Sequence, residues 1–376
     1  MAFELDHSYR RLQEEAAAVA DVVRPFAAEA DASSTLHPGV RDALAASDLW
    51  SILVPASHGG RDALVDPLAV CVVRETLMAT SSHLDSLFAL QGIGSYAIAT
   101  AGTEEQKAAW LPKVATGEAL AAIALTEPDA GSDLKSISTT LERRDGGLRL
   151  TGRKAFISNA GAAAFYTTLV READGLSLVL VSADSERLSV EPVPELIAPH
   201  VLGDVVFDGV ALEEGDRIGA PGAGLDAVLA TFTVFRVSVA GAAVGLAQAA
   251  LEEATRHARQ RVQFGRPLIR LGAVAEQLAD AWTDVEMARL LTYRAAERAK
   301  GDPVAALPHS SMAKVAATEA ACRVVDRCVQ VMGRFGLVRD TTIERLYRTA
   351  RPMRIYEGSS EVLRLGIARA LAEEIP

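Results

Sequence analysis

The chain has 376 residues, enough for two or three domains around a large shared core. Lys and Arg number 38 against 49 Asp and Glu, so the formal net charge is −11. Because such a chain has no basic field to neutralise phosphates, nucleic acid is not expected as a general partner. The three cysteines do not have the spacing of metal ligands, so no metal site is expected. Their odd number also argues against a framework of disulfides, and we expect buried thiols in a reducing cytoplasm.

Neither a targeting segment nor a membrane span is expected. The N-terminal residues Met-Ala-Phe-Glu-Leu-Asp-His lack the cationic-then-apolar pattern of a signal peptide. The longest apolar run, Val237–Leu251, is too short to span a bilayer and is interrupted by Gln248. The sequence therefore predicts a cytoplasmic protein without a membrane partner.

Apolar residues recur at helical spacing in the first third of the chain. The predicted helices run from Tyr9 to about Ala30 with a kink at Pro25, from Pro38 to near Trp50, and over Pro67–Met78, Leu84–Ala101 and Glu104–Val114. Thr103 is the expected N-cap of the last of these. We predict an all-helical domain over residues 1–120.

Short β-branched segments replace the helical pattern in the middle of the chain. The predicted strands are Leu148–Arg153, Tyr166–Val170, Leu176–Ser182, Leu188–Pro192 and Val205–Phe207. Asp145-Gly146-Gly147 and Asp174-Gly175 have the chemistry of hairpin turns. We predict a small β domain, a barrel or sandwich, over residues 121–225.

Helical periodicity returns in the last third. The predicted helical segments run from Leu225 to Lys300, Pro308 to Met332, Thr341 to Ala350 and Ser360 to Glu374. Long helices joined by short links favour an antiparallel four-helix bundle, which we predict over residues 226–376. The predicted fold class is therefore α+β.

Glu357 lies on the short connection between the last two predicted helices. Pro352 interrupts the first helix, Gly358 supplies a permissive backbone, and Ser359 or Ser360 supplies an N-cap for the second. A carboxylate partly desolvated in such a turn has a raised pKa and suits a general base. The alternative is that Glu357 merely complements the dipole of the helix that follows.

The segment Ile-Tyr-Glu-Gly-Ser-Ser-Glu around Glu357 resembles the active-site signature of the acyl-CoA dehydrogenases, and the resemblance extends over almost the whole chain. It implies a helical, a β and a helical-bundle domain in that order, with FAD as the cofactor. It implies that Glu357 removes the α-proton of an acyl thioester while flavin N5 accepts the hydride, which gives a trans-2-enoyl thioester. It also implies an electron-transfer flavoprotein as electron acceptor, and a homodimer or homotetramer.

Two motifs match the family's contacts with the flavin ring. Leu125-Thr-Glu-Pro-Asp-Ala-Gly-Ser-Asp133 has an irregular backbone whose N–H groups can donate to a ligand. Phe156-Ile-Ser-Asn159 matches the family's Trp-Ile-Thr-Asn. The resemblance implies flavin contacts from Leu125, Thr126, Gly131, Ser132, Phe156, Ile157 and Ser158, with Ser132 also near substrate.

Two further motifs match the family's contacts with the nucleotide part of FAD. Residues 259–266 carry the pattern Arg-x-x-Phe-Gly, and an Arg fork suits the diphosphate of a flavin held mainly by a neighbouring subunit. Residues 330–336 resemble Gln-x-x-Gly-Gly-x-Gly, with Arg334 where the family has its second glycine. The implied cofactor contacts are Arg261, Gln263, Phe264, Gln330, Gly333, Arg334, Ser359 and Glu361.

The substrate positions depart most from the family. Arg236 ends Phe-Thr-Val-Phe-Arg where the family has Phe-Asp-x-x-Arg near the coenzyme A thioester arm, so Thr233 replaces an Asp. This leaves open whether the acyl group arrives on coenzyme A or on an acyl carrier protein. Residues 88–98, which include Ser95, are expected to line the pocket for the acyl tail, and Gly358 is expected beside the substrate.

Three other functions stay open. Phe156 in place of Trp is compatible with an acyl-CoA oxidase or a flavin oxygenase on the same fold, since it can alter access to reduced flavin. Dehydrogenation at an unusual position, as in secondary metabolism, is another alternative. A non-catalytic flavoprotein scaffold is the third, although such a protein has no need of Glu357.

Overall fold

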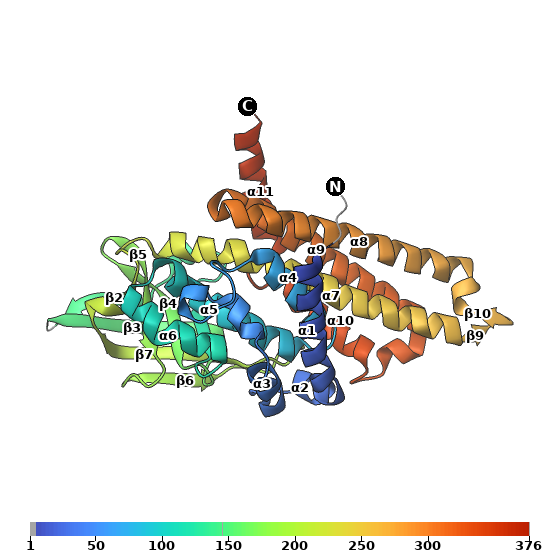
Figure 1. Cartoon of the computed structure of the whole chain (residues 1–376), viewed down its shortest axis with the longest axis horizontal. Coiled ribbons are helices and arrows are strands. Elements are labelled where there is room, and N and C mark those ends of the chain that lie inside the picture. Colours follow the sequence, from blue (N-terminus) through green and yellow to red (C-terminus); the bar gives the residue numbers. More distant parts are fainter. Residues whose placement is uncertain (1–4, 145, 376) are drawn as a thin grey trace. The chain divides into compact units, whose positions relative to one another are not determined.

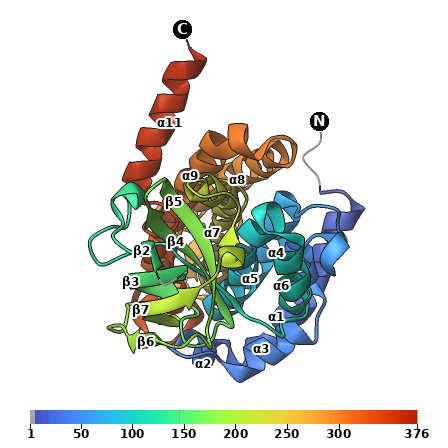
Figure 2. The ribbon, with the colours of Figure 1, turned by 90° about the vertical axis from the view of Figure 1, so that its left-hand side faces the viewer.

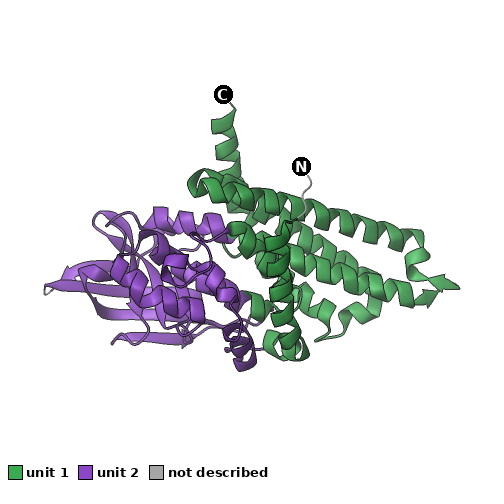
Figure 3. Cartoon of the chain, in the orientation of Figure 1, with its two compact units in different colours: residues 1–32, 67–85, 236–376 green, residues 33–66, 86–235 purple. Residues whose placement is uncertain are grey.

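The computed structural model describes residues 5–144 and 146–375. These residues form two compact units (Figure 3). Unit 1 contains the described residues up to 32, residues 67–85 and those from 236 onward, and unit 2 contains residues 33–66 and 86–235. The predicted turn residue Asp145 lies outside the described residues. The predicted division into three domains stays a prediction.

Unit 1 is helical apart from one short hairpin of two strands (Figures 1 and 3). Its core consists mainly of small side chains, Ala and Val, which let long helices pack closely. α9 packs against α8, α10 and α11. The helices that contribute to this unit are α1 (His7–Val23), α2 (Ala27–Asp31), α4 (Pro67–Met78), α7 (Gly224–Gln260), α8 (Gly272–Gly301), α9 (Pro303–Met332), α10 (Thr342–Met353) and α11 (Ser360–Glu374).

Helix α7 crosses α4 at two glycines. A Cβ on Gly245 would lie 1.9 Å from the Glu75 carbonyl oxygen, and one on Gly241 would lie 2.6 Å from the Cys71 carbonyl oxygen. Only glycine therefore permits this approach of the two backbones. By length and composition α7 could cross a membrane, but 78% of its most apolar window is buried within the protein, as in a core helix.

The ends of the helices follow local signals. Pro25 lies in the 3₁₀ turn between α1 and α2, as predicted. Asp302 caps α9 by accepting from the backbone N–H groups of Val304 and Ala305, so this helix begins before Pro308, where its start was predicted. The helical segments predicted between Leu225 and Lys300 are two helices, α7 and α8, and the hairpin β9 (Val262–Gln263) and β10 (Arg266–Pro267) separates them.

Unit 2 contains the helices α3 (Pro38–Ala45) and α6 (Glu104–Thr116) and most of α5 (Ser82–Ala101). Thr103 caps α6, as predicted, in a reciprocal arrangement with Gln106. The helix predicted to reach Trp50 ends earlier, at Ala45, and a 3₁₀ turn follows over Leu49–Leu53.

The strands of unit 2 form one eight-stranded sheet, and Figure 2 shows β6, β7, β3, β2, β4 and β5 of this sheet following one another in that order. Seven of them follow the order β6-β7-β3-β2-β4-β5-β8, and β1 pairs in parallel with β4. The predicted α+β fold class is confirmed. The strands are β1 (Ala121–Ala124), β2 (Thr140–Arg144), β3 (Gly147–Ser158), β4 (Phe165–Glu172), β5 (Gly175–Ser182), β6 (Leu188–Pro192), β7 (Leu202–Leu212) and β8 (Arg217–Ile218).

A bulge interrupts the pairing of β3 with β7. The register shifts between Lys154 and Ile157, so two residues of β3 leave the regular ladder. One of them, Phe156, has a φ of 55° and its side chain is 52% exposed. The bulge therefore turns outward an aromatic side chain from a strand whose neighbours Ala155 and Ile157 are buried.

Candidate functional site

Glu357 occupies a strained turn between α10 and α11. Its φ is 53°, a left-handed value that a residue with a Cβ adopts only at a cost, and the next residue, Gly358, has a φ of 101°. Ser359 is the N-cap of α11, and its hydroxyl accepts from the N–H of Val362. The predicted tight connection is confirmed, and Pro352 lies in the last turn of the preceding helix.

Two cations hold the main chain of this turn. Arg236 Nε donates to the Glu357 carbonyl oxygen at 2.9 Å, and Lys314 Nζ donates to the Gly358 carbonyl oxygen at 2.8 Å. Arg236 Nη1 also donates to Ser311 Oγ at 3.2 Å. Both cations are buried, Lys314 completely. Arg236 therefore contacts the backbone at Glu357, while its predicted contact with the substrate arm stays a prediction.

One carboxylate oxygen of Glu357, Oε2, is buried without a hydrogen-bond partner among the described residues. Burial raises the pKa of Glu357, against the opposing effect of Arg74, Arg236 and Lys314. Arg74 itself is tied by two hydrogen bonds to Asp85, at 2.9 and 2.7 Å. A sheltered oxygen with a raised pKa is suited to accept a proton near neutral pH.

The loop of residues 125–133 is braced from inside unit 2. Lys154 Nζ donates to the Leu125 carbonyl oxygen at 3.0 Å and to Glu127 Oε1 at 2.8 Å. Glu127 also accepts from the backbone N–H groups of Ser138 and Thr139. The brace lets the loop expose its tip: Leu125 is buried and Thr126 half-buried, whereas Gly131 and Ser132 are exposed.

The bulge of β3 lies next to a polar pair. The Phe156 N–H donates to Asp204 Oδ1 at 3.0 Å, which ties the bulge to β7. Ser158 Oγ and His200 Nε2 are 3.0 Å apart. Ile157 is buried in the core of the sheet. The structure thus presents Phe156 outward, while Ser158 is engaged by a histidine that the sequence had not singled out.

The Arg-x-x-Phe-Gly motif forms the hairpin between β9 and β10. Phe264 and Gly265, the two turn residues, have φ values of 50° and 73°, as a type I′ turn requires. Phe264 is 90% exposed, and Arg261 and Gln263 are also exposed. An aromatic ring held outward at the tip of a strained turn is typical of a residue that contacts something outside its own chain.

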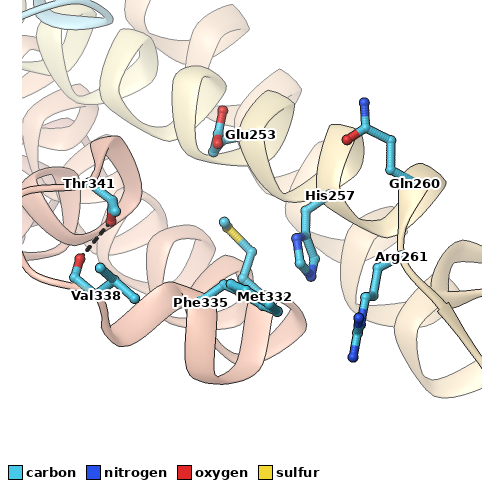
Figure 4. A pocket seen from close by; sticks show the side chains of 8 residues that line it. All are labelled: Glu253, His257, Gln260, Arg261, Met332, Phe335, Val338 and Thr341. Atoms are coloured by element: carbon cyan, nitrogen blue, oxygen red, sulfur yellow. Dashed lines mark hydrogen bonds between the residues drawn. The ribbon is translucent and has the colours of Figure 1, made fainter.

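A cleft of about 500 Å³ lies between the end of α7 and the segment after α9 (Figure 4). It brings together two of the predicted motifs, because Arg261 lines it from one side and Phe335 from the other. The Phe335 ring is 5.8 Å from the Arg261 guanidinium and 5.0 Å from that of Arg334. Gly333, the C-cap of α9, has φ 59° and ψ −133°, a combination open essentially to glycine.

The remaining predicted residues are placed as follows. Ser95 is buried, and its hydroxyl donates to the Gln91 carbonyl oxygen at 2.6 Å. Gln330 and Glu361 are exposed. Sequence reasoning missed Lys314, Arg74, Lys154 and His200, whose positions only the packing reveals. Among the described residues, no group of three or more His, Cys, Asp or Glu side chains is placed to hold a metal ion.

The residues present fit FAD. An exposed Arg261 beside a cleft with an aromatic wall suits a diphosphate and its nucleotide, and the exposed tip of the loop at Gly131 leaves room for a ring system. The unpartnered Oε2 of Glu357 suits an acid–base role that such a cofactor requires.

Comparisons with known proteins agree with this geometry. Three family models match: the acyl-CoA dehydrogenase N-terminal domain over residues 7–118, the middle domain over 122–210 and the C-terminal domain over 222–372. An acyl-CoA dehydrogenase of Bacillus subtilis is 34% identical over 331 residues, 86% of each chain.

Two solved structures extend the comparison over the whole fold. Butyryl-CoA dehydrogenase from Megasphaera elsdenii superposes with a TM-score of 0.94 at 27% identity, over 99% of this chain and 100% of that one. The FAD complex of PigA superposes with a TM-score of 0.91 at 25% identity, over 100% of both chains. The chain belongs to the acyl-CoA dehydrogenase family and is an FAD-dependent oxidoreductase of that family.

Proposed function

We propose that the protein converts an acyl-CoA to its trans-2-enoyl-CoA, with Glu357 as the base that removes the α-proton. The observation that carries this proposal is the state of Glu357: its Oε2 is sheltered, without a hydrogen-bond partner among the described residues, and its pKa is raised by burial. FAD, when bound, supplies the acceptor for the hydride that leaves the β-carbon.

The residues around Glu357 account for how the base works. Removing a proton beside a thioester requires stabilisation of the developing charge on the carbonyl oxygen. In the proposed reaction the backbone N–H of Glu357 donates to that oxygen while Oε2 receives the proton. Arg236 and Lys314 hold the neighbouring carbonyls, so the turn keeps its shape during proton transfer.

Most of the residues that would hold the cofactor are exposed or lie in a loop, and the exceptions are Ile157 and Ser158 at the end of β3. In this proposal the flavin ring lies against Leu125, Thr126, Gly131, Ser132, Phe156, Ile157 and Ser158. The nucleotide part, from the flavin of a neighbouring subunit, lies against Arg261, Gln263, Phe264, Gln330, Gly333, Arg334, Ser359 and Glu361. The cleft between Arg261 and Phe335 supports this assignment.

The substrate contacts in the proposal are Ser132, Ser95, Arg236 and Gly358. Coenzyme A is favoured as the carrier because the family acts on acyl-CoA, and an acyl carrier protein is the alternative. The residue before Arg236 is Phe235, which is buried and packs edge-on against Tyr96, with the two ring centroids 5.8 Å apart. It is not ionisable, so it offers no second base next to Arg236.

We also propose that the protein is a cytoplasmic homodimer or homotetramer whose electron acceptor is an electron-transfer flavoprotein. Exposed apolar side chains support association between copies: Phe264, Trp282, Met287, Leu365 and Leu371 all lie on the surface of unit 1.

The test is anaerobic bleaching of the flavin by a panel of acyl-CoA and acyl-carrier-protein thioesters. We expect a subset of acyl-CoA thioesters to bleach wild-type protein and none to bleach Glu357→Gln. Bleaching of Glu357→Gln at the wild-type rate would exclude Glu357 as the base. Bleaching by carrier-protein thioesters alone would exclude coenzyme A as the carrier.

An oxidase is the second candidate, favoured by one observation. Phe156, whose side chain is about half exposed on the bulge, has a smaller ring than the Trp of the family pattern, so it would cover less of a bound flavin. Stopped-flow mixing of the reduced, product-bound enzyme with air separates the two functions. Slow reoxidation supports the dehydrogenase, and fast reoxidation supports the oxidase.

A further inference from the structure

Lys314 is a buried cation in an otherwise small and apolar stretch of α9. Its neighbours Ala313 and Val315 are buried, and its own side chain has no exposure to solvent. Burying an ammonium group is costly unless its charge is used, and a hydrophobic side chain of similar volume would stabilise the helical core better. Stability of the fold therefore does not account for a lysine at this position.

The ammonium group of Lys314 faces the turn that carries Glu357. Its Nζ donates to the Gly358 carbonyl oxygen at 2.8 Å, one residue beyond the carbonyl to which Arg236 donates. Arg236 comes from α7 and Lys314 from α9, so two helices hold the two successive peptide groups that flank Gly358, the first of which is the Glu357–Gly358 link. These two hydrogen bonds fix the carbonyl end of Glu357 and the orientation of Gly358, and so restrict where the Glu357 side chain can lie.

The grip acts where the backbone is under strain. Glu357 has a Cβ and a φ of 53°, and Gly358 has a φ of 101°. A left-handed residue of this kind persists only when its surroundings hold it there. The two charge-assisted hydrogen bonds are made to the carbonyl oxygens of these two residues.

The charges that face Lys314 come from four elements. They are Glu357 on the turn, Arg236 on α7, Glu319 on α9 and Glu361 on α11. Glu319 is already paired with Arg354 at 2.9 Å and Arg364 at 3.4 Å. Glu357 is therefore the principal anion left to Lys314, and the two groups titrate in each other's presence.

We propose that Arg236 and Lys314 are positioning residues that hold Glu357 in its reactive place, and that deprotonation of Lys314 releases this hold. The inference rests on the proposed role of Glu357 as the base and adds regulation of that site by pH. A neutral amine still donates a hydrogen bond, but the charge-assisted bond to the Gly358 carbonyl and the attraction to the Glu357 carboxylate are lost.

The direction of the pH dependence follows from the same contacts. Burial lowers the pKa of Lys314 from 10.5 to about 8, so its ammonium loses the proton within a range that the enzyme can survive. Burial raises the pKa of Glu357. Proton transfer to Glu357 should therefore rise with pH as Glu357 ionises and fall again near pH 8 as Lys314 is neutralised.

The test measures proton removal without turnover. Acetoacetyl-CoA has an acidic α-carbon, and the absorbance of its bound enolate reports proton transfer to the base in the holoenzyme. Enolate formation is followed between about pH 6 and 10 in the wild type, Glu357→Gln, Lys314→Met and Lys314→Arg, since Arg stays charged over this range. Melting temperatures are recorded for the same proteins.

We expect the wild-type enolate signal to fall near pH 8. In Lys314→Arg this fall should be absent up to pH 10, which would be rescue by retained charge. In Lys314→Met enolate formation should decrease of the order of 10²-fold at neutral pH, because a small displacement of a base is that costly. Its loss of function should come without a loss of melting temperature.

Arg289→Met is the matched control. It also removes a cation from unit 1, one that is half-buried and is paired with Glu75, with the two charged atoms 2.9 Å apart. This variant should have a lower melting temperature than the wild type, and its enolate signal should still fall near pH 8.

The outcomes separate the two proposals. The inference about Lys314 would be overturned if the enolate signal fell at the same alkaline pH in the wild type, Lys314→Arg and Lys314→Met. It would also be overturned if Lys314→Met formed as much enolate as the wild type at neutral pH. Persistence of the enolate in Glu357→Gln, or its absence from the wild type, would instead overturn the proposed role of Glu357.

Discussion

Lys154 and Glu127 form an ion pair in the interior of unit 2, with Nζ and Oε1 2.8 Å apart and side chains that are 0% and 3% exposed. The same ammonium group donates to the Leu125 carbonyl oxygen, so one side chain ties both the charge and the backbone of the loop of residues 125–133. Burial acts to raise the pKa of Glu127, but hydrogen bonds from Lys154 and from residues 138 and 139 outweigh it and lower the pKa to about 2.

Lys154→Met should destabilise the protein by about 3–5 kcal/mol, because it leaves the carboxylate of Glu127 buried without its counter-charge. It should also weaken retention of FAD if the loop contacts the flavin as proposed. Urea denaturation and the fraction of flavin that survives gel filtration measure the two effects. Unchanged stability would show that the pair contributes nothing net to the fold.

The depressed pKa of Glu127 predicts a specific acid sensitivity. A carboxyl group whose pKa is lower in the folded than in the unfolded state stabilises the fold above its unfolded value of about 4.5, and this stabilisation is lost as the pH falls toward about 2. Its size at neutral pH is about 3 kcal/mol. Glu127→Gln should therefore be less stable than the wild type at pH 7, and the difference should shrink below pH 4.

Glu357→Gln should behave in the opposite way. Because burial raises the pKa of Glu357, the folded state binds the proton more tightly than the unfolded state, and ionisation destabilises the fold as the pH rises. The amide variant should therefore melt at an equal or higher temperature than the wild type at pH 8, while flavin bleaching by substrate is lost. A lower melting temperature at pH 8 would contradict the raised pKa.

Gly358→Ala should disrupt the same turn through its backbone. Gly358 has a φ of 101°, and an added Cβ would lie 2.8 Å from Leu363 Cδ2. We expect a loss of about 1–3 kcal/mol together with reduced activity, because the start of α11 must move. Gly366→Ala is the matched control on the same helix: nothing lies within 4 Å of its added Cβ, so it should stabilise by roughly 0.5–1 kcal/mol.

Lys314→Met should not destabilise the protein at pH 7. Since burial lowers the pKa of Lys314 to about 8, keeping its ammonium charged costs the fold about 3 kcal/mol below that pH, and this cost is relieved as the pH rises toward 10.5. Methionine removes the cost but leaves the Gly358 carbonyl without its donor, which costs about 1–3 kcal/mol. The net expectation is between no change and a gain of about 2 kcal/mol, measured by urea denaturation.

The elements whose bounds the sequence predicts best have a sharp local signal at one end or the other. α4, β6 and α11 have the predicted bounds, since Pro67, Pro192 and the serines at 359 and 360 mark their limits. β1 was missed because Ala-Ala-Ile-Ala favours a helix, and only parallel pairing with β4 makes it a strand. The motif of residues 259–266 was recognised, but the hairpin that it forms between α7 and α8 was not predicted.

The residues of the candidate site also differ in whether local sequence signals predict them. Glu357 could be identified because a glycine, a proline and a serine cap define its turn within a few residues. Lys314 and Lys154 could not, because a single lysine in a helix or strand pattern looks like a solvent-facing residue. Their burial depends on partners at Gly358 and Glu127, 44 and 27 residues away in the chain, which no local pattern indicates.

Phe264 allows strain and function to be separated. Asparagine tolerates the left-handed conformation and is favoured before glycine in a type I′ turn, so Phe264→Asn should stabilise the hairpin by roughly 1 kcal/mol. It also removes the ring that we propose contacts the flavin of a neighbouring subunit, so retention of FAD and self-association should both weaken. Phe264→Ala is the matched variant, because it loses the ring but keeps the strain. We expect both variants to lose flavin and self-association equally, as measured by gel filtration and light scattering, and only the asparagine variant to be more stable than the wild type. Full retention of flavin in both variants would exclude Phe264 from the cofactor site.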